Sequence, residues 1–158
     1  MQTEIQHAPI NILLADDDID DCIFFKAAVD EFPLPTQLTT VHDGEQLMLL
    51  LACETNELPD ILFLDLNMPR KNGFECLSEI KFNKKFSKLP VIMYSTSFDQ
   101  GIVNLLYKNG AQYFIRKPSE FLQFKKIIQQ TLTLIMQENI SPATEENFVL
   151  TIKNSLII

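Results

Sequence analysis

The sequence predicts a doubly wound α/β sandwich built on a five-stranded parallel sheet. Short apolar runs alternate five times with segments of helical periodicity, and Gly, Pro and Asn mark the turns between them. Parallel strands need crossover helices, and nearly continuous apolar strands indicate a sheet that is covered on both faces. Three of the apolar runs end in charged residues, so acids and a base are expected at the ends of strands.

The elements follow one another in strict alternation. We expect strands at 10–15, 37–41, 61–64, 91–94 and 111–115, and helices at 19–30, 45–53, 74–80, 102–107 and 121–135. Ser119 is the expected cap of the last helix, and Asn109-Gly110 the stop of the one before. Five such units favour the flavodoxin-like strand order 2-1-3-4-5, whose cleft lies between the ends of the first and third strands.

Length and composition exclude several classes of protein. The chain has 158 residues, 46% of them hydrophobic, which suits one domain with a real core. Its net charge of −8 argues against a nucleic-acid partner, and no segment has the length of a signal peptide or membrane span, so we expect a cytoplasmic protein without a membrane partner. Cys22, Cys53 and Cys76 lie in apolar patterns and predict mostly buried thiols in a reducing compartment.

Residues 9–136 are expected to form the domain, and residues 137–158 a C-terminal extension. The stretch 138–147 is polar and contains Pro142, as linkers do, whereas the tail from Phe148 to Ile158 is apolar. Such a tail either packs on its own domain or docks on another subunit or a partner, for example by adding a strand to a sheet edge.

The charged strand ends carry the candidate chemistry. Asp16 and Asp17 follow the first strand, Asp65 ends the third, and Lys117 follows the fifth. Because the carboxyl ends of parallel strands lie on one edge, these residues are expected to converge. Clustered carboxylates repel one another unless a hard divalent cation, Mg²⁺ (or Mn²⁺), lies among them. Its ligands would be Asp17, Asp65 and the backbone carbonyl of Asn67, with Asp16 one water away.

Asp65 has a second potential role, since a carboxylate can attack phosphorus and form an acyl phosphate. The cation, Lys117 and the hydroxyl of Ser95 at the end of the fourth strand would each cover one phosphoryl oxygen. Taken singly, these residues have simpler explanations: Asp16 or Asp18 as a helix cap, Asp65 as a turn brace, and the others as ordinary strand-end side chains. Only their joint placement favours a phosphoryl site.

Together these residues resemble the CheY-like receiver domain of two-component response regulators, over roughly Ile10 to Met136. The resemblance rests on Ala15-Asp16-Asp17-Asp18, Leu64 to Pro69 with Gly73, Pro90 to Ser95, and Lys117-Pro118. Two segments, from Asp65 to Gly73 and Ser95-Thr96-Ser97, are most similar to the corresponding segments of one subgroup of the family. This subgroup consists of stand-alone regulators similar to cyanobacterial phytochrome regulators.

The resemblance implies that Asp65 accepts a phosphoryl group from a histidine kinase or a phosphotransfer protein. It implies a cation at Asp16, Asp17, Asp65 and the Asn67 carbonyl, and a cis peptide bond between Lys117 and Pro118. Ser95 and Lys117 would hold the phosphoryl group, flanked by Asn67, Thr96 and Ser97, although Thr96 is a second candidate for the hydroxyl role.

In this interpretation, Ser95 and Phe114 form the signalling switch. Phe114 occupies the position at which members of this family frequently have Tyr. Ser95 moves toward the phosphate, Phe114 swings inward, and the surface from Leu105 to Phe124 repacks. The residues after Met136 fit no output domain, so the signal would pass to a downstream protein target, a homodimer or onward phosphotransfer. The protein would be an enzyme only toward its own phosphorylation and dephosphorylation.

Two alternatives come from other functional classes. An aspartate-nucleophile phosphohydrolase carries Asp-x-Asp after its first strand, whereas the best acceptor here follows the third; turnover of a small phosphoester would identify one. A binding module with the same fold would never take phosphate, and intact mass after treatment with acetyl phosphate and Mg²⁺ would identify that.

Overall fold

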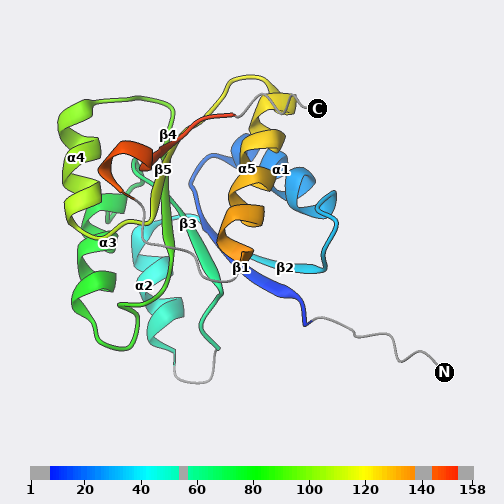
Figure 1. Ribbon diagram of the computed structural model, residues 1–158. Helices are drawn as coiled ribbons and strands as arrows, with labels where there is room; N and C mark the ends of the chain where they lie inside the picture. The colour runs from blue at the N-terminus through cyan, green and yellow to red at the C-terminus, as the bar shows by residue number, and fades with distance from the viewer. Residues whose placement is uncertain (1–7, 54–56, 138–143, 153–158) are drawn as a thin grey trace.

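The structure is a computed structural model that describes residues 8–53, 57–137 and 144–152. Strands and helices alternate along the chain, as Figure 1 shows. The strands are β1 (Ile10–Ala15), β2 (Thr36–Val41), β3 (Ile61–Asp65), β4 (Val91–Ser95), β5 (Tyr113–Arg116) and β6 (Val149–Leu150). The helices are α1 (Ile19–Asp30), α2 (Gly44–Ala52), α3 (Gly73–Phe82), α4 (Gln100–Lys108) and α5 (Phe121–Met136), with a 3-10 turn η1 (Glu145–Asn147).

The sheet is parallel throughout, in the order β2-β1-β3-β4-β5-β6. The expected order 2-1-3-4-5 is confirmed and is extended by one strand. Helices α1 and α5 cover one face, and α2, α3 and α4 cover the other, which gives three layers (Figure 1). Because the strand order reverses between β1 and β3, their carboxyl ends border the cleft that this topology predicts.

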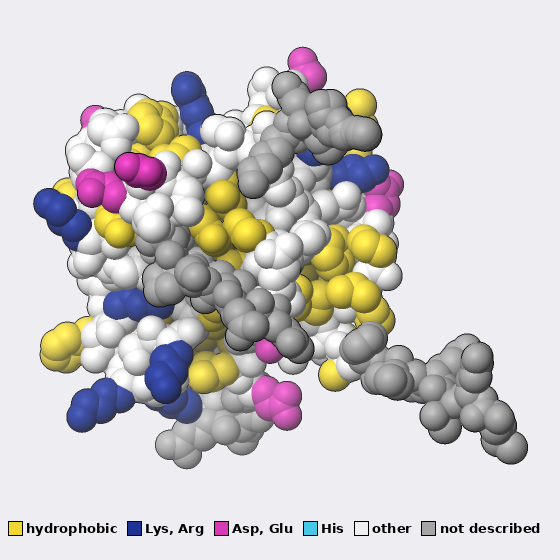
Figure 2. Space-filling model, in the orientation of Figure 1, with side chains coloured by type: hydrophobic (Ala, Val, Ile, Leu, Met, Phe, Trp, Pro, Cys, Tyr) yellow, Lys and Arg dark blue, Asp and Glu magenta, His cyan; other side chains and the backbone are white. Residues whose placement is uncertain are grey.

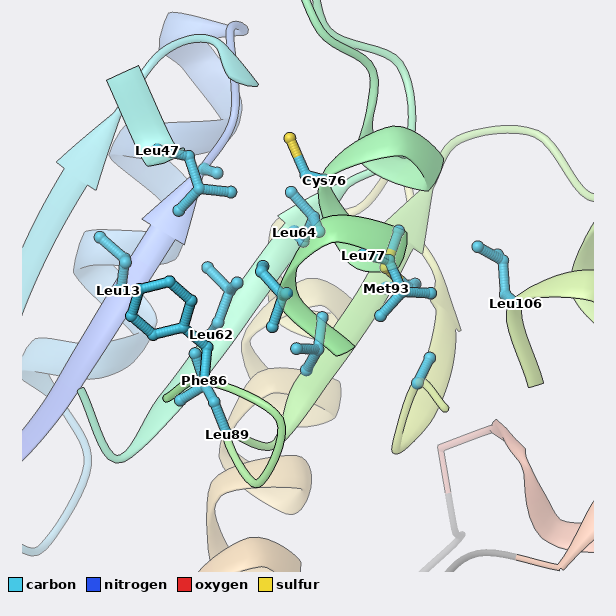
Figure 3. Packing of buried hydrophobic residues seen from close by; sticks show 14 of the residues in the cluster. Leu13, Leu47, Leu62, Leu64, Cys76, Leu77, Phe86, Leu89, Met93 and Leu106 are labelled. Atoms are coloured by element: carbon cyan, nitrogen blue, oxygen red, sulfur yellow. The ribbon is translucent and has the colours of Figure 1, made fainter. Parts of the chain in front are cut away.

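Two apolar cores lie on opposite faces of the sheet. On one face, Leu13 and Leu64 pack with Leu77 of α3, as Figure 3 shows. On the other face, Phe25 of α1 meets Phe63 of β3 with ring centroids 4.8 Å apart and nearly edge-on. This double coverage explains why the central strands are apolar at successive positions instead of alternating with polar residues.

Most helices begin at a side-chain cap that closely follows a strand end or its loop. Three caps are aspartates that accept a hydrogen bond from the backbone N–H three residues later: Asp18, Asp43 and Asp99. Asn72 and Glu75 form a capping box at α3. Helix α5 differs, because it begins one position after Glu120, which makes no side-chain cap bond. The expectation that Ser119 caps this helix is therefore wrong: Ser119 lies one residue too early.

The C-terminal tail adds a sixth strand, which the prediction of five strands lacked. Strand β6 pairs with β5, placing Val149 beside Phe114. Phe148 is buried, and its ring lies 5.3 Å from that of Tyr107 in α4. The tail thus packs on its own domain, which is the first of the two alternatives, and it does so by strand addition, because an open β5 edge offers unpaired backbone groups. Residues 138–143 of the expected linker and residues 153–158 lie outside the described residues.

The cysteines follow the expectation only in part. Cys76 is buried and Cys22 is half-buried, but Cys53 is exposed. Cys53 is the C-cap residue of α2, at the end of the helix. The prediction of a buried thiol was wrong there because an apolar sequence pattern does not reveal where a helix stops facing the core.

A group of lysines lies at the end of the sheet away from the acid cluster. Exposed Lys84, Lys85 and Lys88 follow α3, and Figure 2 shows basic side chains gathered below that helix. The acidic residues that follow β1 and β3 lie at the other end, where the strands finish. Among the described helices, none has the length and apolar character needed to cross a bilayer.

Candidate functional site

Four charged residues from three strand ends meet at the carboxyl edge of the sheet. One carboxylate oxygen from each of Asp16, Asp17 and Asp65 lies within 4.8 Å of the other two. Lys117 Nζ donates to Asp16 Oδ2 at 3.1 Å and to Asp65 Oδ2 at 3.2 Å. The side chain of Lys117 is only 4% exposed, so these ionic hydrogen bonds are shielded from water. The predicted convergence of these four residues is confirmed.

Asp65 is held at the end of β3 by the loop that follows it. The Asn67 N–H donates to Asp65 Oδ1 at 3.2 Å, so the chain folds back over the carboxylate. Gly73 starts α3 directly beneath, and a Cβ there would lie 2.3 Å from the Asp65 carbonyl oxygen, which only glycine avoids. Between them, Arg70 adopts a left-handed backbone with φ 69°, and its Nε lies 3.8 Å from Asp43 Oδ2.

Asp16 is fully buried, and donors already surround both of its carboxylate oxygens. The Asp18 N–H donates to Oδ1 at 2.9 Å, while the Tyr94 hydroxyl and Lys117 Nζ donate to Oδ2. His42 Nδ1 lies 3.1 Å from the Asp16 carbonyl oxygen, so the residue after β2 also reaches this edge.

Ser95 supplies the hydroxyl that faces the acid cluster. It is fully buried, and its Oγ accepts hydrogen bonds from Asn67 Nδ2 at 3.3 Å and from the Ser97 N–H at 3.2 Å. The Ser97 Oγ lies 3.2 Å from the same atom, whereas Thr96 is exposed. The hydroxyl of Ser95, and not that of Thr96, is therefore the one next to the loop that follows Asp65.

Phe114 lies inward, with 1% of its surface exposed. Its ring centroid is 5.9 Å from that of Phe98, in an edge-on arrangement. Phe114 is thus buried against Phe98 in this structure, and its role as a switch stays a prediction.

The expected cis bond between Lys117 and Pro118 is wrong, because the described residues contain no cis peptide bond. The trans form is the favoured isomer, and it already brings Lys117 Nζ to Asp65.

Two residues of the site escaped the sequence analysis. Asp21, in the first turn of α1, accepts a hydrogen bond from Lys117 Nζ at 2.8 Å. Tyr94 bonds Asp16 through its hydroxyl and presents its ring to Lys117, with Nζ 4.4 Å from the centroid. Asp21 has the sequence context of any acid at a helix start, and Tyr94 that of any core aromatic. The one available signal was position: Tyr94 directly precedes Ser95 at a strand end.

Burial and charge perturb the ionisable groups of the site. Burial raises the pKa of Asp65 to about 7, although Lys117 opposes that rise. Burial alone would lower the pKa of Lys117, but its hydrogen bonds to Asp21 and Asp16 and the charge of Asp65 outweigh burial, so the pKa rises. Burial, followed by the negative charge of Asp16, also raises the pKa of the Tyr94 hydroxyl. The site therefore holds a permanent ammonium beside a carboxyl that ionises near neutral pH.

The donor set fits a hard divalent cation. Four carboxylates, those of Asp16, Asp17, Asp21 and Asp65, face one ammonium, so negative charge is in excess when all are ionised. Three of the four present oxygens close enough to share one ion, and oxygen is the ligand that Mg²⁺ and Mn²⁺ prefer.

Comparison with known proteins decides the family. The family model for the response regulator receiver domain matches residues 12–129. The chain belongs to this family. The response regulator Rcp1 of Synechocystis sp. is 28% identical over 125 residues, which cover 77% of this chain and 85% of Rcp1. The chemotaxis protein CheY of Listeria monocytogenes is 31% identical over 100 residues, which cover 63% of this chain and 82% of CheY.

Solved structures agree with this assignment. The structure of phosphorylated RcpA, a cyanobacterial phytochrome response regulator, aligns with a TM-score of 0.79 at 28% identity, covering 86% of this chain and 100% of RcpA. The Mn²⁺-bound form of Rcp1 aligns with a TM-score of 0.77 at 26% identity, with the same coverage. Together with the acid cluster, these likenesses support divalent metal binding, as in other receiver domains.

Proposed function

We propose that the protein accepts a phosphoryl group on Asp65 from a histidine kinase or a phosphotransfer protein, and signals through α4, β5 and α5. The observation that carries this proposal is the contact of buried Lys117 Nζ with the buried carboxylates of Asp65 and Asp16, beside the exposed Asp17. In the transfer, an Asp65 oxygen forms a bond to phosphorus while the bond from phosphorus to the donor's histidine nitrogen breaks.

A cation, Mg²⁺ (or Mn²⁺), would be held by Asp17, Asp65 and the backbone carbonyl of Asn67. Asp16 would act through a water, because its two oxygens already accept three hydrogen bonds from protein groups. The bound cation would neutralise charge on the phosphoryl oxygens. The excess of carboxylates over ammonium groups supports this requirement.

Lys117 and Ser95 would bind the remaining phosphoryl oxygens. Lys117 Nζ already lies on Asp65 Oδ2, so it needs only a small shift to donate to an oxygen of the attached group. The Ser95 hydroxyl shares Asn67 as a neighbour with the Asp65 carboxylate. Asn67, Thr96 and Ser97 would flank the phosphate and influence its hydrolysis, the one reaction besides its own phosphorylation that the protein catalyses.

The phosphoryl donor would dock on the α1 and α5 side of the site. Ile19 and Ile23 in α1 and Leu122 in α5 are exposed by 59% or more. The two helices are joined at this end by Phe24 and Phe121, whose ring centroids are 5.4 Å apart. Exposed apolar side chains on these two helices suit a protein partner.

Output would leave through Phe114 and the surface of α4, β5 and α5. Within this proposal, residues 9–136 form the receiver, residues 137–158 an extension, and the protein is cytoplasmic. The recipient is a downstream protein target or a second copy of the chain in a homodimer. The exposed apolar residues of α4, Ile102 and Leu105, support a protein surface there.

The test is intact mass after treatment with acetyl phosphate and Mg²⁺. The wild-type chain should gain one phosphoryl group, and Asp65→Asn should gain none. Asp20→Asn is the matched control, because Asp20 is an exposed acid in the same part of the protein, and it should react as the wild type does. An unmodified wild-type chain would instead identify a binding module, and steady turnover of a small phosphoester would identify a phosphohydrolase.

A further inference from the structure

The ammonium of Lys117 has three partners, and one of them does not come from a strand end. Nζ donates to Asp16 and Asp65, and it donates at the shortest of the three distances, 2.8 Å, to Asp21 in α1. A lysine ammonium has three N–H donors, so three carboxylates satisfy it completely. This matters because Nζ is buried, where a donor left without a partner is costly.

Asp21 differs from the other two partners in its relation to the cation site. Among the described residues, the carboxylates close enough to share one ion are Asp16, Asp17 and Asp65, and Asp21 is not one of them. Its side chain is 21% exposed and reaches Lys117 from the first turn of the helix. Asp21 is therefore the one Lys117 partner that a cation in the cleft leaves untouched.

Lys117 and a divalent cation compete for the same atoms. Nζ now occupies Asp65 Oδ2 and Asp16 Oδ2, and Asp65 is also a candidate ligand. Two positive charges that share carboxylates repel each other, so cation binding weakens the hold of Lys117 on these oxygens. Without a further partner, the buried ammonium would either lose its hydrogen bonds to these carboxylates when the cation binds, or keep them and weaken cation binding.

We propose that Asp21 is a positioning residue that anchors Lys117 and so releases Asp16 and Asp65 for the divalent cation. It acts on the cation through Lys117, and keeps Nζ at the rim of the cleft, within reach of an incoming phosphoryl group. The last step rests on the proposed function; the effect on cation affinity does not require phosphorylation.

The experiment measures Mg²⁺ affinity by calorimetry on the full chain, without a phosphoryl donor. Asp21→Ala should weaken binding about tenfold, because Lys117 then holds Asp16 and Asp65 more firmly. Asp21→Asn keeps an acceptor oxygen and should fall between Asp21→Ala and the wild type. Asp20→Ala removes an exposed acid from the same helical turn and should change affinity less than about twofold.

A second background distinguishes anchoring from a direct effect of charge on the cation. In Lys117→Met protein, Asp21→Ala should change Mg²⁺ affinity less than about twofold, because the residue through which it acts is gone. An equal loss in both backgrounds would overturn the proposal, and so would a wild-type affinity in Asp21→Ala. If Asp65 takes no phosphoryl group but this pattern holds, the proposed function fails while the role of Asp21 stands.

Discussion

The cleft and the outer edge of β5 are stabilised by different kinds of interaction. In the cleft, charged side chains from separate strand ends are buried together, with more carboxylates than ammonium groups. At the β5 edge, a short strand adds backbone pairs and the Phe148 ring fills an apolar gap beside α4. The cleft should therefore respond to changes in charge, whereas the edge depends on packing.

The two regions are connected through β5. Phe114 pairs with Met93 of β4 on one side, and its N–H donates to the Phe148 carbonyl at 3.0 Å on the other. Ser95 lies two residues after Met93, at the cleft. A change at Ser95 thus has a short path through two paired strands to the tail.

The largest effect should follow from removing the ammonium that balances the cleft. Lys117→Met leaves three carboxylates without their shared partner and should cost about 4 kcal/mol of unfolding free energy in EDTA. Mg²⁺ should restore part of this loss. Urea unfolding with and without Mg²⁺ measures both effects.

Lys125→Met is the matched control for this variant, because Lys125 pairs with Glu31 near the surface. Its loss should stay below about 1 kcal/mol. Equal losses for the two lysine variants would show that the cleft is not held by charge.

The pH dependence of stability should come from the cleft and not from the edge. Burial raises the pKa of Asp65 from 3.8 to about 7, so the folded protein binds this proton more tightly than the unfolded chain does. Without a divalent cation, this contribution is complete at low pH and is lost as pH rises from about 4 to about 7, by at most about 4 kcal/mol. Urea unfolding across this range should show the slope in the wild type and a flatter profile in Asp65→Asn; identical slopes would contradict the assignment.

The edge should respond to loss of packing. Phe148→Ala should cost about 3 kcal/mol, the low end for a buried Phe, because the tail can detach instead of leaving a cavity. The amide of Phe114 should then exchange faster with solvent, since its acceptor is the Phe148 carbonyl. Hydrogen exchange measures this, with exposed Glu146→Ala as the control. Unchanged protection of that amide would mean that the tail does not depend on Phe148.

The sequence predicted the cleft better than the edge, for a physical reason. Asp16, Asp65 and Lys117 each end an apolar run, and parallel topology brings such ends together, so local pattern was sufficient. The tail strand was left between alternatives because the docking place of Val149 depends on an edge more than thirty residues away. Asp21 was missed because it lies in the first turn of α1 and not at the end of a strand, so its local sequence is that of any acid at a helix start.

The smallest change in stability, and the sharpest test of the link between the regions, should come from Ser95→Ala. Its hydroxyl bonds Asn67 and Ser97, and losing it should cost about 1 kcal/mol. Phosphorylation of Asp65 should continue at a reduced level, because Lys117 and the carboxylates remain. The amide chemical shift of Phe114, which should move on phosphorylation in the wild type, should move much less in this variant.

Thr96→Ala is the control for the hydroxyl, because Thr96 is exposed beside Ser95. It should keep the full Phe114 response under acetyl phosphate and Mg²⁺. If Ser95→Ala responds as Thr96→Ala does, Ser95 does not carry the signal, and the cleft reaches the β5 edge by another route. If only Ser95→Ala loses the response, a charge placed on Asp65 is converted into a packing change at Phe114 through β4, because this strand carries the buried Ser95 and pairs with both β3 and β5.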